Sequence, residues 1–145
     1  MCKDGSCNGE WACEDATIPY VVNSCKEEKA CTKAGSGGSV GNSVNSCHGS
    51  HVCTGIGYRG VVGNIQDSCK GELSCFYAGA KGGFIGSITA SCDRFMACSY
   101  IGYGSPLSLD LASCCNYISY DLPPPCYRAD KDTILASCSA EASVM

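Results

Sequence analysis

The stretch SCKGELSCFYAGAKGGFIGSIT, residues 68–89, is one copy of a pattern that runs through most of the chain. A Ser-Cys dipeptide opens it, a second cysteine follows six residues after the first, and glycine pairs and short apolar pairs come next. The neighbouring copies, which begin at Ser46 and Ser91, repeat these features in the same order. Such self-similarity at a short, fixed period is typical of a tandem repeat array.

The Ser-Cys dipeptides set the length of the repeat. Their cysteines are Cys7, Cys25, Cys47, Cys69, Cys92, Cys114 and Cys138. The intervals are 18, 22, 22, 23, 22 and 24 residues, so the unit is about 22 residues long. One aliphatic column precedes the next cysteine by seven residues: Ile18, Val40, Val62, Ile85 and Leu107. Another precedes it by three or four: Val21, Val44, Ile65, Ile88, Leu111 and Ile134.

These short apolar stretches, bounded by glycine corners, favour strands, and no segment has a sustained helical period. We therefore predict an all-β, disulfide-rich β-solenoid (β-helix) of about six to seven coils with roughly 22 residues per coil. Residues 1–145 are expected to form one continuous array that belongs to a longer chain, with irregular final coils at 114–145. The three prolines at 123–125 predict a bulging loop, because proline cannot donate a ladder hydrogen bond. Regular winding is expected to resume at residues 133–135, and neither end shows a capping segment.

Composition indicates the surroundings of the chain. Fifteen cysteines and 18 glycines in 145 residues are typical of a disulfide-stapled extracellular scaffold. A formal charge of -4, with ten scattered basic residues, argues against a nucleic-acid partner. No apolar run approaches the roughly 20 residues that span a bilayer, so membrane insertion is not expected. The sequence predicts a secreted or cell-surface protein.

The cysteine columns allow two kinds of pairing. Within each coil, the two cysteines would close a small loop; between coils, each would bond its equivalent about 4.8 Å away, a spacing that a disulfide accepts. We favour pairs within coils, because the two cysteines recur together, and the sixth coil gains Cys115 and Cys126. The candidate disulfide cysteines are Cys7, Cys13, Cys25, Cys31, Cys47, Cys53, Cys69, Cys75, Cys92, Cys98, Cys115 and Cys126. The odd total leaves at least one thiol without a partner in the chain, and Cys2 and Cys138 are the candidates.

No pattern predicts a metal, a cofactor or a catalytic group. Zinc sites bring cysteines closer together than the six-residue spacing found here. His48 and His51 have no third ligand in their columns, and the acidic residues lie in different columns: Glu14, Asp15, Asp67, Asp93 and Asp110. The serine before each cysteine recurs too often for a single activated nucleophile, so its hydroxyl is expected to bond a backbone group or the next serine. We predict that the protein is not an enzyme.

Tyrosines offer one possible recognition surface. Tyr77 and Tyr100 share a column, as do Tyr58 and Tyr103, so these four predict an aromatic strip beside the glycine corner. The strip either binds polysaccharide or a protein partner, or packs as a ladder between coils. An ice-binding face would need a hydroxyl in the same column of every coil, whereas only Thr32 and Thr54 are in register.

The unit at residues 68–88 resembles the cysteine-rich repeat arrays of predicted extracellular proteins from diatoms and related algae, and five to six units match. The resemblance implies a β-solenoid in a secreted or cell-surface setting and no catalytic residue. We expect an extracellular structural or adhesive scaffold that self-associates with copies of itself, or with neighbouring repeats, through its uncapped ends. The alternative is a module that recognises polysaccharide with the tyrosine strip or ice with a flat face.

Overall fold

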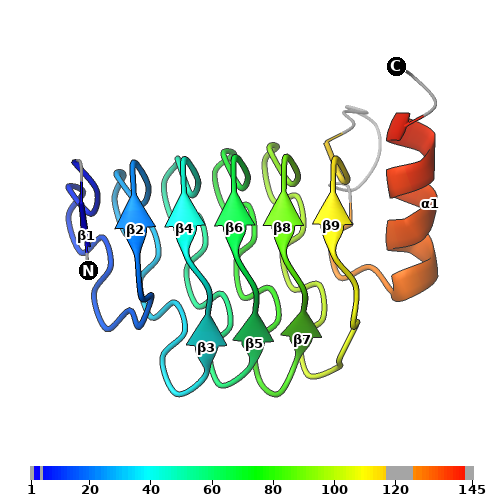
Figure 1. Cartoon of the computed structure of the whole chain (residues 1–145), viewed down its shortest axis with the longest axis horizontal. Coiled ribbons are helices and arrows are strands. Elements are labelled where there is room, and N and C mark those ends of the chain that lie inside the picture. Colours follow the sequence, from blue (N-terminus) through cyan, green and yellow to red (C-terminus); the bar gives the residue numbers. More distant parts are fainter. Residues whose placement is uncertain (1, 4, 117–125, 143–145) are drawn as a thin grey trace.

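The computed structural model (Figure 1) describes residues 2–3, 5–116 and 126–142, with side chains for 5–116 and 126–138. The prolines at 123–125 lie outside these residues. The strands are β1 (Cys2–Lys3), β2 (Val21–Val22), β3 (Ser39–Val40), β4 (Ser43–Val44), β5 (Val61–Val62), β6 (Ile65–Gln66), β7 (Phe84–Ile85), β8 (Ile88–Thr89) and β9 (Leu111–Ala112). One α-helix, α1 (Lys131–Ala142), follows them. This helix is too short to cross a bilayer, and the described residues contain no helix that could.

The strands form two parallel sheets along a rod (Figure 1). One sheet has the order β1-β2-β4-β6-β8-β9 and the other has the order β3-β5-β7. Residues in register are one repeat apart, as in the pairs Ser43–Ile65 and Ile65–Ile88. The chain is therefore a disulfide-rich β-solenoid, as the repeat predicts. The regular winding is shorter than the predicted six to seven coils, since about four full turns lead from β2 to β9. Coils are numbered by their cysteine pairs, from Cys7–Cys13 in the first to Cys115–Cys126 in the sixth.

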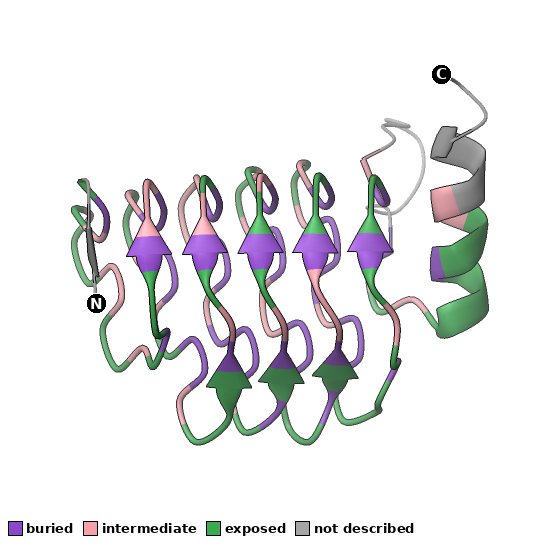
Figure 2. Cartoon of the chain, in the orientation of Figure 1, coloured by how far each residue is buried: buried purple, intermediate pink, exposed green. Residues whose placement is uncertain are grey.

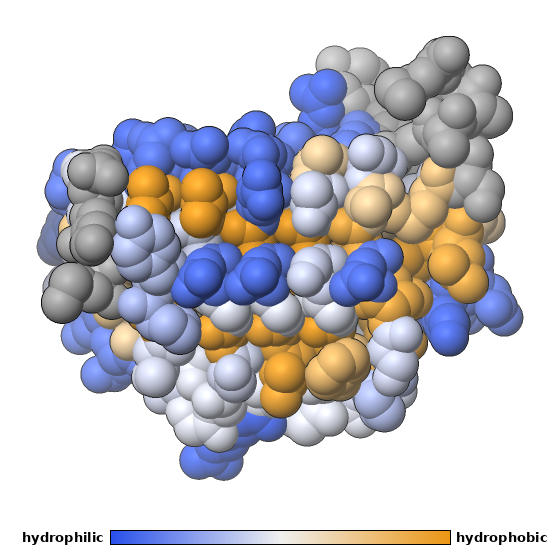
Figure 3. All heavy atoms as spheres, viewed as in Figure 1, coloured by the Kyte–Doolittle hydropathy of each residue, from blue (hydrophilic) through white to orange (hydrophobic). Residues whose placement is uncertain are grey.

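Each strand from β2 to β9 places one residue in the core and one outside it (Figure 2). Val40, Val62 and Ile85 are at most 2% exposed, whereas their strand neighbours face solvent. This follows from the alternation of side chains along a strand. In β4 the inward residue is Ser43 and not the predicted Val44, because strand register with Ile65 sends Val44 to the outer face. Apolar and hydrophilic side chains consequently form rows along the sheet face (Figure 3).

The third side of the coil consists of overlapping turns instead of a strand. In the coil that begins at Cys69, the Ala78 N–H donates to the Cys75 carbonyl at 3.2 Å, three residues back. Tyr77, the residue before Ala78, donates its N–H to the Thr54 carbonyl of the preceding coil, 2.9 Å away. Gly79 then donates to the coil after, at the Ile101 carbonyl, 2.8 Å away. The turns thus build a continuous ladder between coils without a strand.

The residues that donate between coils adopt positive φ. Cys75, Tyr77 and Gly79 have φ angles of 55°, 51° and 64°, and the equivalent residues of the other coils repeat this conformation. Left-handed backbone is unfavourable for residues with a Cβ, so the hydrogen-bond ladder and the disulfides must hold it in place. Glycine is required where space is also short: a Cβ on Gly79 would lie 2.6 Å from Val62 Cγ2.

The serine column is structural, as predicted. Ser24, Ser46, Ser68 and Ser91 are 0% exposed. The Ser46 hydroxyl donates to the Val44 carbonyl at 2.7 Å and accepts the Ser68 backbone N–H at 3.2 Å. The same pair of bonds recurs from coil to coil, so each hydroxyl is satisfied on both sides.

The sixth coil is offset by one residue from the predicted alignment. Cys114, and not a serine, occupies the next position in this column. Its N–H donates to Ser91 Oγ at 2.9 Å, and its Sγ lies 3.0 Å from the Ala112 carbonyl oxygen. Cys115 then takes the place of the first cysteine. It is bonded to Cys126, with a sequence separation of 11 where the regular coils have 6. Five extra residues therefore enter between the two cysteines of this coil.

The predicted return to regular winding at residues 133–135 is wrong, because these residues belong to α1. Asp130 caps the helix, as its Oδ1 accepts the Thr133 N–H at 2.8 Å. Ile134 is fully buried, and the Ser137 hydroxyl accepts the Cys115 N–H at 3.3 Å. The seventh Ser-Cys pair thus lies on a helix that covers the last coil (Figure 1), so the expectation of two uncapped ends is also wrong.

Candidate interaction surfaces

The disulfides occupy the interior and link cysteines within coils. The pairs are Cys7–Cys13, Cys25–Cys31, Cys47–Cys53, Cys69–Cys75, Cys92–Cys98 and Cys115–Cys126. A further bond joins Cys114 to Cys138. Cys138 was expected to be one of two candidates for a free thiol, and that expectation is wrong. No described cysteine is free, while the side chain of Cys2 lies outside the described residues.

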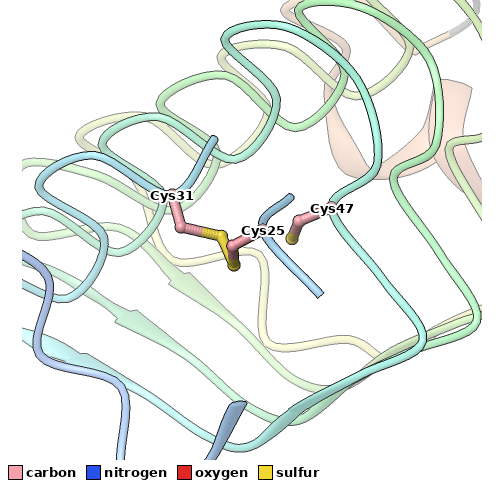
Figure 4. Close-up of side chains that lie close together, drawn as sticks. All are labelled: Cys25, Cys31 and Cys47. Atoms are coloured by element: carbon pink, nitrogen blue, oxygen red, sulfur yellow. A yellow bond between two sulfur atoms is a disulfide. The ribbon is translucent and has the colours of Figure 1, made fainter. Parts of the chain in front are cut away.

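Sulfur atoms of successive coils lie close together. Figure 4 shows the Cys25–Cys31 disulfide beside Cys47, and these three sulfur atoms lie within 4.8 Å of one another. Cys92, Cys98 and Cys115 form a similar group. Each of these sulfurs already belongs to a disulfide, so neither group offers the thiolates that bind zinc. The stacked sulfurs act as core, together with the isoleucines and valines.

The histidines and acidic residues do not converge. His48 Nε2 contacts the Asn23 carbonyl at 2.7 Å, and His51 Nδ1 contacts Ser50 Oγ at 2.7 Å. Asp93 is the acidic residue with a buried atom: its Oδ1 has no hydrogen-bond partner among the described residues, and burial raises its pKa. Lys70 and Arg94 oppose this rise in pKa, and Asp67 adds a small contribution to it. Among the described residues, none of these side chains belongs to a group of three potential metal ligands.

The two in-register threonines are engaged with the backbone. Thr32 Oγ1 donates to the Trp11 carbonyl at 2.8 Å, and Thr54 Oγ1 donates to the Lys29 carbonyl at 2.7 Å. Their hydroxyls stabilise contacts between coils. This arrangement gives no support to an ice-binding face.

The four predicted tyrosines do come together; we call Tyr58, Tyr77, Tyr100 and Tyr103 the tyrosine edge. Tyr77 and Tyr100 stack with ring centroids 6.0 Å apart and an interplanar angle of 12°. Tyr58 and Tyr103 contact this pair edge-on, at 6.4 and 5.5 Å. The edge therefore packs as a ladder, which was one of the two alternatives. Tyr103 differs from the other three because it is 38% exposed.

Cations lie over these rings, an arrangement that the column pattern did not predict. The Arg59 guanidinium lies 5.3 Å from the Tyr58 ring centroid, and Lys81 Nζ lies 5.4 Å from that of Tyr103. Arg128 lies 5.1 Å from the Tyr100 centroid. A hydrogen bond with Tyr103 raises the pKa of Lys81, so its ammonium is charged at neutral pH. The signal was present in the sequence, since Arg59 and Lys81 occupy the same column.

A groove of about 360 Å³ lies at the helix end of the tyrosine edge. Its lining includes Tyr100, Tyr103, Arg128, Asp130 and Lys131. Hydrogen bonds from Thr133 lower the pKa of Asp130, whose carboxylate caps α1. The groove exists because α1 begins where the next coil would have continued.

The first coil presents an open edge at the other end of the rod (Figure 1). In the second coil, the Lys29 and Lys33 N–H groups donate to the Glu10 and Glu14 carbonyls at 2.9 and 2.7 Å. The equivalent N–H groups of the first coil belong to Trp11 and Asp15, and within the described part of the chain neither has an acceptor. We call these two N–H groups, with the carbonyls of Ala12 and Ala16, the open edge.

Comparison with known proteins gives a partial match. A family model described as a domain of unknown function, DUF7640, matches residues 1–64, which contain the units that begin at Ser6 and Ser24 and most of the unit that begins at Ser46. Neither a curated protein nor a solved structure matches the chain. The class of protein that the fold defines is therefore a disulfide-rich, cysteine-repeat β-solenoid. Such a fold fits an extracellular structural module.

Proposed function

We propose that this protein is a secreted, non-catalytic structural module that associates through its open edge with another coil of the same kind. The open edge carries the proposal. Its N–H and carbonyl groups are equivalent to groups that form hydrogen bonds between coils in the rest of the array. Unpaired ladder groups at the edge of a sheet are a ready template for pairing. The coil that pairs with them comes from a second copy of the chain.

The covered C-terminal end limits how copies associate. Helix α1 occupies the face where a second molecule would otherwise continue the array, so stacking of one molecule's open edge on the other's last coil is blocked. Two open edges instead meet face to face around a two-fold axis, and such an isologous contact closes on itself. The proposed product is a dimer and not a fibre.

The direct test is amide hydrogen exchange at increasing protein concentration, with the mass in solution measured in parallel by light scattering. We expect a dimer to form and the Trp11 and Asp15 amides to become protected as it does. Trp11→Lys, which places a charge beside the open edge, should weaken the dimer, whereas Phe95→Lys should not. Both side chains are exposed, at 52% and 55%, but Phe95 lies in the fifth coil, away from the open edge. A monomer at every concentration, or a dimer whose edge amides still exchange freely, would refute the proposal.

A second candidate function is polysaccharide recognition by the tyrosine edge. The specific observation in its favour is the groove beside Tyr103, whose lining combines this exposed ring with Arg128 and Lys131. Tyrosine combines an apolar ring with a polar tip, which suits a sugar surface. The likeness to algal extracellular arrays is compatible with either function.

A further inference from the structure

The outer columns of the tyrosine edge carry positive charge on a chain that is acidic as a whole. The formal net charge is -4. The column of Tyr77 and Tyr100 also holds Lys33 and Arg128, and the column directly after Tyr58 and Tyr103 holds Arg59 and Lys81. Asp15 occupies the first of these columns in the first coil, so the cations are found from the coil of Cys25 onward. Scattered cations on an acidic protein would normally lie near carboxylates, so this segregation creates a local positive potential.

These cations contact rings in place of carboxylates. The described residues include a single ion pair, between Lys29 and Glu28, which lies away from the edge. Arg59, Lys81 and Arg128 lie over tyrosine rings at 5.1 to 5.4 Å. A cation over a ring keeps its outer hydrogen-bond donors, and the planar guanidinium presents them as a fork that matches a carboxylate or a sulfate. The edge is thus supplied with positioned donors for anions.

The tyrosine rings differ in how accessible they are to a ligand. Tyr77 and Tyr100 stack on each other, so the faces between them are occupied. Tyr103 is exposed and lines the groove; Lys81 lies over one face of its ring, so a sugar would pack on the opposite face. The groove volume of about 360 Å³ is at the small end of the range for ligand sites. A short stretch of a chain molecule fits there, and its continuation would follow the cations along the rod.

The one carboxylate in the groove does not cancel this preference. Asp130 Oδ1 accepts the Thr133 N–H at the start of α1, so its charge is directed to the helix N-terminus. Arg128 and Lys131 flank it in the groove lining. The local balance is two cations to one engaged anion.

We propose that the tyrosine edge and its groove bind an anionic polysaccharide, with carboxylate or sulfate groups held by Arg128, Lys81 and Arg59 and a sugar ring packed on Tyr103. This inference rests on the second candidate function and names its ligand class. It is independent of dimer formation at the open edge, which lies at the opposite end of the rod.

The test is calorimetric titration of the intact, disulfide-bonded chain with four polymers. We expect binding to polygalacturonate and to dextran sulfate, weakening as salt is raised, and no binding to neutral dextran. The two anionic glycans separate carboxylate from sulfate preference. Polyglutamate carries the same charge as polygalacturonate without sugar rings and should bind at least tenfold more weakly. Equal binding of polyglutamate, or of neutral dextran, would overturn the proposal.

Matched variants locate the site. Arg128→Gln and Tyr103→Ala should each weaken polygalacturonate binding by about tenfold, since one charged hydrogen bond or one ring contact accounts for a factor of that size. Arg94→Gln and Phe95→Ala remove the same kinds of side chain from an exposed position outside the edge and should change binding less than twofold. Lys81→Gln provides a second edge variant in case Arg128→Gln perturbs folding, which circular dichroism and non-reducing mass spectrometry will reveal. Equal losses in edge and control variants would also overturn the proposal.

Light scattering on the same samples reports dimer formation separately. If one proposal fails, the other can therefore still be tested.

Discussion

Cys114 and Cys138 are joined by a disulfide that fastens helix α1 to the last coil of the solenoid. Cys114 stands in the column that serine occupies in the regular coils, and Cys138 lies one turn of helix after the buried Ile134. The replacement of one serine by cysteine in the sixth coil thus turns a repeating hydrogen-bond position into a covalent anchor. The anchor and the helix together end the array.

The first prediction concerns this anchor. The double variant Cys114→Ser/Cys138→Ser should release α1, at a cost of about 3 kcal/mol in the free energy of unfolding, because the lost cross-link closed a loop of 24 residues. Serine at position 114 keeps the ladder hydrogen bond, so the coils should stay folded. Hydrogen exchange should show loss of protection in α1 alone.

Release of α1 should also change assembly. With both ends open, the variant should form oligomers larger than a dimer at concentrations where the parent chain stops at two. Light scattering measures the difference. If the variant keeps the parent's mass and α1 protection, the helix is not held by this disulfide.

The second prediction concerns left-handed backbone. Lys33 is exposed with φ of 57°, and the next coil has glycine at the equivalent position, Gly55. Lys33→Gly should therefore stabilise the fold by roughly 0.5 to 1 kcal/mol, since glycine adopts this conformation without a steric penalty. Gly35→Ala should do the opposite, by about 2 kcal/mol or more, because its Cβ would lie 2.6 Å from the Thr17 carbonyl. Urea unfolding of the two variants tests the pair, and the same sign for both would contradict the account.

The third prediction concerns the serine ladder. Ser46→Ala removes the acceptor of the buried Ser68 N–H and should cost about 1 to 3 kcal/mol. Ser39→Ala, on the exposed position of β3, is the matched control and should cost less than about 0.5 kcal/mol. Thermal unfolding of the two variants measures the difference. Similar losses in the two variants would mean that the hydroxyls contribute little to the free energy of unfolding and that packing determines it.

The fourth prediction concerns the disulfides as a set. The core is thin, and each loop closed by a pair six residues apart is worth about 2 kcal/mol by the chain-entropy estimate. Full reduction should therefore unfold the array near neutral pH without denaturant. Alkylation before reduction, followed by mass spectrometry, should label none of the 14 bonded cysteines. If these cysteines are labelled in the native protein, they are free thiols. The disulfides could then support neither the stability of the fold nor the extracellular setting.

The fifth prediction is a pH dependence of α1. Hydrogen bonds from Thr133 hold the pKa of Asp130 below its ordinary value of 3.8, so the ionised carboxylate is favoured in the folded state. Its contribution is complete above pH 3.8 and is lost as the pH falls through the lower, folded-state pKa. Helical circular dichroism should fall in that acidic range. Asp130→Asn keeps an N-cap that does not titrate, so its helix signal should change less over the same range.

Much of this architecture could be predicted from the periodicity. The period of 22 to 23 residues, the inward aliphatic columns and the cysteine pairs within coils all recur, and recurrence averages out the ambiguity of any single segment. Prediction failed where the repetition fails. The helix over Lys131–Ala142 has little amphipathic pattern, and its Ser137-Cys138 pair imitates the repeat, so local pattern alone pointed to another coil.

The features of the candidate sites also divide into those that follow the repeat and those that do not. The column rule brought Tyr77 and Tyr100 together correctly, because residues one period apart must stack. It could not place Arg128 over Tyr100, since five extra residues between Cys115 and Cys126 shift the column. Nor could it foresee the groove, which depends on where α1 docks.

The sequence by itself determined the solenoid, because stacking identical units gives every residue type the same environment in each coil. Only the tertiary structure decided how the array ends, which edge stays open and where cations meet rings. Those features arise from contacts made once between segments that share no period, here the last coil, helix α1 and the tyrosine edge, and a single sequence carries no repeated signal for a contact that occurs once.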